Sequence, residues 1–194
     1  MSAFLPLTGE PLAIDLVNTR VRLPDIGWVD TVESLSGLQH WVARQDGRLT
    51  VTGRLTKADL AGVLTLRDHV ATALQYARRR ERPPATPMAG INHELAAAAP
   101  TWRLTWSRDG RLVQEKKYTP GGGPALLHQL AQASADLLSD PMVTSVQDCA
   151  MPDCVVQFYP TNSRRKWCVD AICGNRARVA RHYRKKRSAL HHQA

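Results

Sequence analysis

The sequence WCVDAICGNRARVARHYRKKR, from Trp167 to Arg187, places two cysteines directly before a run of basic residues. Cys168 and Cys173 are separated by four residues. A second pair with the same spacing, Cys149 and Cys154, lies just upstream, so all four cysteines of the 194-residue chain fall within a short segment. Such clustering is typical of a metal site or of a disulfide framework.

The four-cysteine pattern favours one structural zinc ion. Zinc accepts four thiolates in a tetrahedron, which leaves no coordination position for an activated water. A segment of about 40 residues is too small to fold on a hydrophobic core alone, and metal binding can replace that core. Another metal, an iron–sulfur cluster or disulfides are the alternatives.

The N-terminus and the overall hydropathy favour a cytoplasmic protein. The first twenty residues lack the basic region, apolar run and cleavage site of a secretory signal, and charges interrupt the longest apolar stretches. We therefore expect a reducing compartment, where disulfides are rare, and no membrane contact.

Charge is strongly segregated along the chain. The formal net charge is +9, and the segment from Cys149 to Ala194 carries ten basic and two acidic residues, 10 − 2 = +8. The preceding 148 residues hold the other 16 basic and 15 acidic residues, 16 − 15 = +1. This segregation predicts a polyanionic partner for the C-terminal segment.

The chain is expected to be α+β, with a largely helical N-terminal domain over residues 1–145 and a small zinc finger over 146–194. Apolar periodicity predicts helices over 31–44, 56–80, 90–99 and 125–139, with Asp30 or Thr31 capping the first and Thr56 the second. Alternation of apolar and polar residues on either side of Ser-Arg-Asp-Gly predicts an antiparallel hairpin over residues 101–118. The stretch LAIDLVNT, residues 12–19, alternates weakly and looks extended.

The finger itself is expected to follow a treble-clef order. A turn with Pro152 connects the first cysteine pair, and residues 155–159 and 164–167 are expected to form a short hairpin. A helix should begin after Gly174 and run to about Ala189, with Val179 and Tyr183 packed on Trp167 or on the hairpin.

These residues resemble a known family. Cys173-Gly174-Asn175-Arg176 spells CGNR, and with Phe158-Tyr159, Trp167-Cys168 and the basic helix it is similar to the CGNR zinc finger of bacterial stress-response transcription regulators. In those proteins an N-terminal ABATE domain, to which ligand binding is attributed, precedes the finger. The stretches at 12–19, 38–41 and 66–68 look like recurring features of that domain.

The basic residues of the finger are candidates for nucleic-acid contact, because arginine and lysine neutralise phosphates and a helix fits the major groove. The candidate contacts are Arg164, Arg165, Lys166, Arg176, Arg178, Arg181, Arg184 and Lys185. A solvated helix face is the alternative. For Arg176, a structural role near the metal is an equal alternative.

Four polar residues in apolar surroundings are candidates for a small-molecule site in the N-terminal domain: Asp15, Asn18, Thr19 and Arg67. This interpretation depends mainly on the resemblance. The alternative is internal pairing, in which Asn18 or Asp15 caps the next element and Arg67 pairs with either of them.

Together these features predict a zinc-containing, DNA-binding transcriptional regulator that is not an enzyme. No phosphate-binding loop, HExxH or GxSxG motif is present. An RNA-binding protein and a protein–protein adaptor with a purely structural finger are the alternatives. A single small finger binds DNA weakly, so a homodimer is a further expectation.

Overall fold

The computed structural model describes residues 9–23, 27–45 and 47–191. The helices are α1 (Leu12–Val17), α2 (Leu35–Ala43), α3 (Lys57–Ala77), α4 (Ala85–Ala97), α5 (Gly122–Ser139) and α6 (Asn175–His191), with a 3-10 turn η1 (Pro141–Ser145) and a π-helical turn η2 (Asp170–Gly174). The strands form antiparallel pairs: β1 (Arg20–Leu23) with β2 (Gly27–Asp30), β3 (Thr101–Trp106) with β4 (Leu112–Lys117), and β5 (Gln147–Asp148) with β6 (Gln157–Phe158). The expected α+β class is confirmed.

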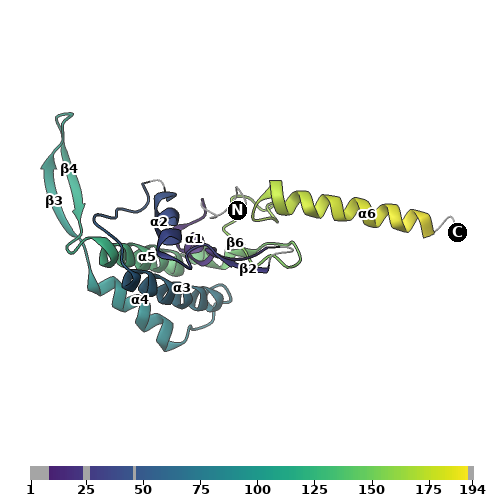
Figure 1. Cartoon of the computed structure of the whole chain (residues 1–194), viewed down its shortest axis with the longest axis horizontal. Coiled ribbons are helices and arrows are strands. Elements are labelled where there is room, and N and C mark those ends of the chain that lie inside the picture. Colours follow the sequence, from purple (N-terminus) through teal and green to yellow (C-terminus); the bar gives the residue numbers. More distant parts are fainter. Residues whose placement is uncertain (1–8, 24–26, 46, 192–194) are drawn as a thin grey trace.

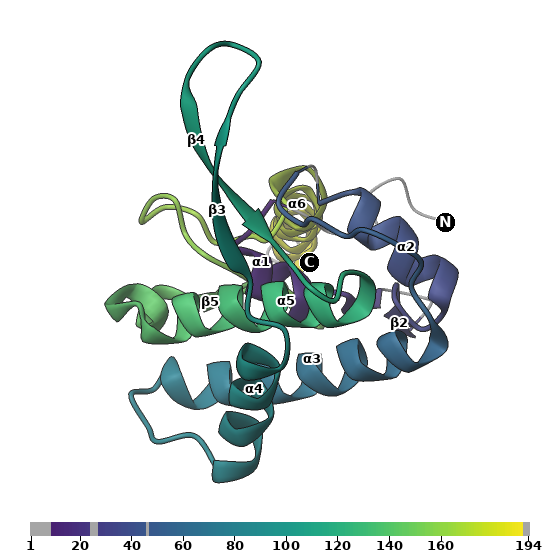
Figure 2. The same cartoon turned by 90° about the vertical axis from the view of Figure 1, so that its left-hand side faces the viewer.

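The core lies where helices α1, α2, α3 and α5 meet (Figures 1 and 2). Trp41 of α2, Ile14 of α1, Leu66 and Leu74 of α3, and Leu126 of α5 are fully or almost fully buried there. The hairpin β3–β4 projects from this body, and α6 extends from it at the other end of the molecule (Figure 1).

Helix α3 begins as the sequence predicts. The side chain of Thr56 accepts the backbone N–H of Asp59, and the Asp59 carboxylate accepts the backbone N–H of Thr56 at 2.7 Å. This reciprocal capping box satisfies donors that have no partner inside the helix. The predicted end at Arg80 is a few residues too late, because Arg80 has a left-handed φ of 58°.

The extended conformation expected for residues 12–19 is wrong. The first six residues of this stretch form the helix α1, and its residues 13–16 are all buried. The Asp15 carboxylate accepts the backbone N–H groups of Gly9 and Glu10 just before the helix, at 3.0 and 3.1 Å. A short apolar run buried on all sides has no distinctive period, so its sequence cannot separate helix from strand.

Helix α2 begins later than predicted. Its N-cap is Ser34, whose hydroxyl accepts the backbone N–H of Gly37 at 3.1 Å, and not Asp30 or Thr31. The Thr31 carbonyl approaches so closely that a Cβ on Gly37 would lie 2.5 Å from it. Thr31 itself donates its N–H to the carbonyl of Thr19, so it is held in the preceding β1–β2 hairpin.

The remaining helices of the body are longer than predicted, and the hairpin is confirmed. Helix α4 starts at Ala85, directly after two prolines, and α5 starts at Gly122 in a stretch that reads as a linker. Proline is tolerated in the first turn of a helix, so Pro124 does not delay α5. Strand β3 pairs with β4 from Thr101–Lys117 to Trp106–Leu112.

The hairpin expected between residues 155–159 and 164–167 is not formed. Strand β6 pairs instead with β5, which precedes the first cysteine. The returning segment is held by the Arg165 side chain, which donates to the carbonyl of Tyr159 at 3.2 Å, and by one backbone bond from Ala150 to Lys166. A long arginine side chain thus replaces part of the expected ladder.

Candidate metal centre and basic helix

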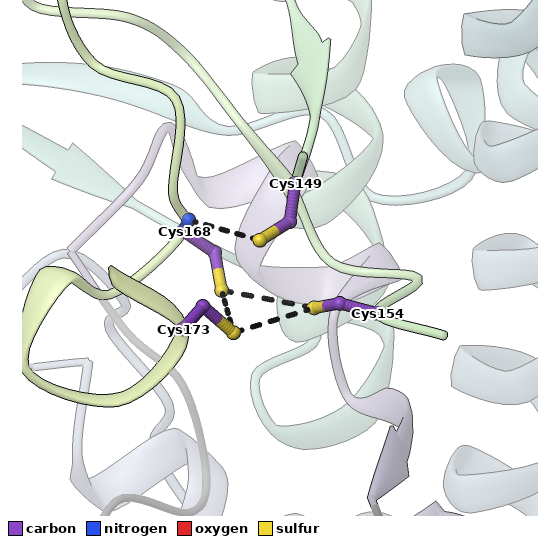
Figure 3. A group of neighbouring side chains, drawn as sticks. All are labelled: Cys149, Cys154, Cys168 and Cys173. Carbon is purple, nitrogen blue, oxygen red and sulfur yellow. Dashed lines mark hydrogen bonds between the residues drawn. The ribbon is translucent and has the colours of Figure 1, made fainter. Parts of the chain in front are cut away.

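The four cysteines converge on one point between the knuckle at residues 149–154 and the turn η2 (Figure 3). Their sulfur atoms all lie within 4.8 Å of one another. The Sγ–Sγ distances are 3.6 Å for Cys168–Cys173, 3.8 Å for Cys154–Cys168 and 3.9 Å for Cys154–Cys173. None of the four cysteines forms a disulfide.

These distances fit a tetrahedral zinc ion. With Zn–S bonds of about 2.3 Å, the sulfur atoms at the corners of a tetrahedron lie about 3.8 Å apart. The three distances above bracket that value. The backbone N–H of Cys168 also points at the sulfur of Cys149, 3.5 Å away, as in the outer hydrogen bonds that orient metal ligands. The four cysteines could therefore hold one zinc ion.

Hydrogen bonds and burial shift the pKa values of three of these thiols in different directions. The hydrogen bond from Cys168 lowers the pKa of Cys154 to about 5. The same bond, together with burial, raises the pKa of Cys168, while burial and the charge on Cys154 raise the pKa of Cys173 to about 12. Cys168 and Cys173 thus carry protons at neutral pH. A divalent ion must displace at least these two, so its affinity rises with pH.

The turn η2 connects the metal centre to the basic helix. It contains the ligand Cys173, which is buried, and leads without interruption into α6 at Asn175. A Cβ on Gly174 would lie 2.2 Å from the Asp170 carboxylate and 3.0 Å from the Trp167 ring, so a side chain here would have to displace that carboxylate and press on the ring. The four-cysteine cluster is therefore joined directly to the first turn of α6.

Helix α6 stands away from the body (Figure 1). Among the described elements its substantial contacts are with η2. The predicted packing of Val179 and Tyr183 is wrong, because their side chains are 46% and 67% exposed. A 17-residue helix is about 26 Å long, and most of its surface faces solvent.

The predicted nucleic-acid residues differ in how exposed they are and in what they contact. Arg164 and Lys166 are exposed on the loop before Trp167, while Arg181, Arg184 and Lys185 are exposed along α6. Arg176 is half-buried in the first turn. Arg178 lies 3.2 Å from the Asp170 carboxylate, with both side chains largely exposed.

Arg165 is placed differently, inside the finger. Its guanidinium lies 4.5 Å from the centre of the Phe158 ring and forms an ion pair with Glu10. It also donates to the carbonyl of Cys168 at 2.8 Å. Arg165 therefore links a metal ligand to the chain segment before α1.

The N-terminal body and the finger are joined by side-chain hydrogen bonds, of which those of Asn18 are buried. Asn18 donates to the carbonyl of Gln157 at 2.7 Å and accepts the N–H of the same residue at 3.0 Å, which completes the free edge of β6. Arg78, the C-cap residue of α3, contacts both carboxylate oxygens of Asp148 at 2.9 Å, and this pair lowers the pKa of Asp148. The finger is thus docked on the body.

We expect Asn18→Ala to loosen this junction. The substitution removes both partners of the Gln157 backbone, and leaving such groups unsatisfied costs about 2 kcal/mol. Urea unfolding of the zinc-loaded protein should show a lower midpoint, whereas Asn92→Ala on the exposed side of α4 should not. An unchanged midpoint for Asn18→Ala would contradict the role given to this bond pair.

The other residues predicted to bind a ligand have partners within the chain. Asp15 is fully buried and lies 2.6 Å from Arg48; burial raises the pKa of this carboxyl against the effect of the arginine. Thr19 accepts from Arg67 at 3.0 Å. The predicted partners of Arg67 are wrong: its guanidinium binds both oxygens of Asp30, at 2.8 and 2.7 Å.

Sequence reasoning missed the residues that complete these contacts, namely Glu10, Asp30, Arg48, Arg78 and Asp148. Each is an ordinary charged residue whose partner is distant along the chain. No local pattern indicates such pairs, so only the folded chain identifies them.

Comparison with known families agrees with this architecture. Residues 10–141 match the ABATE family, described as "Putative stress-induced transcription regulator", and residues 146–186 match the CGNR zinc finger. These are regulator and zinc-finger families. No curated protein matches the chain, and none of its described helices has the length and apolar character needed to cross a membrane. The chain belongs to the ABATE family and carries a CGNR zinc finger at its C-terminal end.

Proposed function

We propose that this protein is a cytoplasmic transcriptional regulator that binds DNA through α6. The observation that carries the proposal is the charge and exposure of this helix. It contains seven arginines and lysines and no acidic residue, and it is attached to the zinc-binding turn at one end. A basic helix held away from the body can enter the major groove, where its cations replace condensed counterions on the phosphates.

The exposed cations divide between the helix and the loop. Arg181 and Lys185 are four residues apart on α6 and so lie on the same side of the helix. Arg164 and Lys166 lie on the loop before Trp167. We assign phosphate contacts to these residues. Arg176 is nearer the metal centre, and we assign it a base or phosphate contact at the start of the helix.

The test is the salt dependence of binding to a fluorescent DNA duplex. The affinity should fall steeply between about 50 and 200 mM salt, and each lost phosphate contact should reduce the slope of log K against log salt by about 1. We expect Arg181→Ala and Lys185→Ala each to weaken binding several-fold at low salt. Arg44→Ala, at an exposed position after α2, is the matched control.

The same measurement separates the alternatives. Single-stranded RNA of equal length should bind less tightly than the duplex, because α6 presents one exposed aromatic residue with a described side chain, Tyr183, next to His182. Tighter RNA binding would instead favour an RNA-binding protein. No salt-dependent binding to either would leave the finger as a structural element of an adaptor.

We also propose that the N-terminal domain senses a small molecule. A pocket of about 290 Å³ lies between α5, α1 and the base of the β3–β4 hairpin, with Arg48, Lys116, Tyr118 and Gln129 in its wall. Arg48 is the partner of Asp15, one of the four residues expected to contact a ligand. Asn18 binds the backbone of β6, so a change in the N-terminal domain on ligand binding can be passed to the finger through this contact. The proposal requires that a bound small molecule move the finger relative to the body. Compounds that raise the melting temperature of the protein are therefore tested by small-angle X-ray scattering, and scattering curves that none of them changes would contradict the proposal.

A further inference from the structure

The β3–β4 hairpin presents an unusual apolar face. Trp102, Leu104 and Trp106 alternate along β3 and therefore point to one side, together with Leu112, which pairs with Trp106. Their side chains are 58%, 66%, 70% and 60% exposed, respectively. We call these four residues the hairpin apolar face. Figures 1 and 2 show that the hairpin stands clear of the helices.

A projecting two-stranded hairpin with an exposed apolar face is unfavourable in a monomer. Two strands alone are marginally stable in water, and a third strand or a packed face is normally required. The sheet that contains β3 and β4 has no other strand, so the outer edge of each carries unpaired backbone groups. Among the described residues, these outer edges have no partner strand.

The exposed apolar area is large for a monomer. If each large apolar side chain offers roughly 200 Å², the four exposed fractions amount to roughly 500 Å² per chain. That is as large as the largest apolar patch of a typical monomer, about 300–600 Å². Pairing at a strand edge covers the flanks of such side chains, so backbone hydrogen bonds and cross-strand side-chain pairs would carry a contact at this edge.

We propose that the hairpin is a dimerisation arm and that its partner is the hairpin of a second copy of this chain. Antiparallel pairing of the two β3 strands about Leu104 places Leu104 opposite its own copy. It also places Trp102 opposite Trp106 of the second copy, twice by symmetry. Every large side chain of the apolar face on β3 then has an apolar neighbour across the new junction.

The charges select the β3 edge over the β4 edge. Strand β3 carries one charged residue, Arg103, which lies on the opposite face and would meet Thr105 of the second copy. Strand β4 ends with Glu115, Lys116 and Lys117. Two-fold pairing about Glu115 or Lys116 would place like charges opposite one another, and lysines at a strand edge discourage pairing.

Pairing through β3 makes a four-stranded sheet in the order β4–β3–β3–β4. The Lys116 ammonium lies 5.5 Å from the centre of the Trp102 ring, so it covers the outer flank of the apolar face without entering the junction. The dimer extends beyond the function proposed for α6 and does not depend on it, since the fingers are not part of the contact.

The experiment is analytical ultracentrifugation of the full chain without nucleic acid, over about 1–100 µM, a range that brackets dissociation constants typical of modest interfaces. Leu104→Arg puts two arginines opposite each other at the two-fold axis. We expect it to raise the dimer dissociation constant at least about 100-fold. Thr101→Arg adds the same charge on the other face of β3 and should leave the dimer intact.

Both variants change exposed positions on the hairpin, so their circular dichroism and zinc content should equal those of the wild type. A wild-type protein that stays monomeric at the highest concentration would overturn the proposal. Equal dimerisation of wild type and Leu104→Arg would do the same by placing the contact elsewhere. A monomer that binds anionic phospholipid vesicles through this face would overturn it in favour of a membrane surface.

Discussion

Cys168→Ser should abolish zinc binding and unfold the C-terminal module. Cys168 contacts the sulfurs of both Cys154 and Cys173, at 3.8 and 3.6 Å, and its N–H points at the sulfur of Cys149. Binding of structural zinc by such a module contributes about 10–16 kcal/mol, which is far more than a segment of this size gains from its core. The zinc content should fall from about one ion per chain to near zero.

The measurement is metal content by mass spectrometry together with proteolysis of the finger. Ala150→Ser is the matched control, because it introduces the same side chain at an exposed position beside Cys149. Chelation of zinc from the wild type should reproduce the effect of Cys168→Ser. A full zinc complement in Cys168→Ser, or a protease-resistant finger without metal, would refute the assignment of these four sulfurs.

Arg67→Met should destabilise the N-terminal body by about 3 kcal/mol, because it leaves the partly buried carboxylate of Asp30 without its counterion. The Arg67 side chain is 7% exposed and that of Asp30 is 22% exposed, so solvent screens this pair only partly. Thr19 also loses its donor. Urea unfolding measured by tryptophan fluorescence should reveal the loss, with Arg44→Met as an exposed control.

A second substitution isolates the charge in that pair. Asp30→Asn in the Arg67→Met background removes the uncompensated carboxylate but keeps an oxygen for the N–H of Val32, which is 3.1 Å from Asp30. We therefore expect part of the stability to return. If Arg67→Met unfolds at the wild-type midpoint, the ion pair does not stabilise the body as proposed.

Local signals predicted several elements well. Thr56 and Asp59 are spaced for a capping box, and the alternation of Trp102, Leu104 and Trp106 is that of a strand. In both cases the partners are a few residues apart in sequence or joined by a short turn. The interactions are therefore decided by local geometry, and the structure confirms them.

Other elements depended on contacts across the chain. Residues 12–17 are a helix because the body surrounds them. Helix α2 is capped by Ser34 because the Thr31 N–H is bound to the Thr19 carbonyl, beside the β1–β2 hairpin. Arg165 was grouped with the surface cations by its sequence, yet its guanidinium lies against Phe158 and Glu10. Charge counting cannot distinguish an arginine paired inside the fold from one that faces solvent.

The sequence by itself determined the chemistry of this protein: four thiols at spacings that suit one metal ion, and a C-terminal segment holding almost all of the net positive charge. Residue type and spacing suffice there, because ligand chemistry and net charge do not depend on distant neighbours. The tertiary structure decided which polar residues pair. It brought Asn18 to Gln157 and Arg67 to Asp30, since a buried hydrogen-bonding group takes whichever partner packing places within reach.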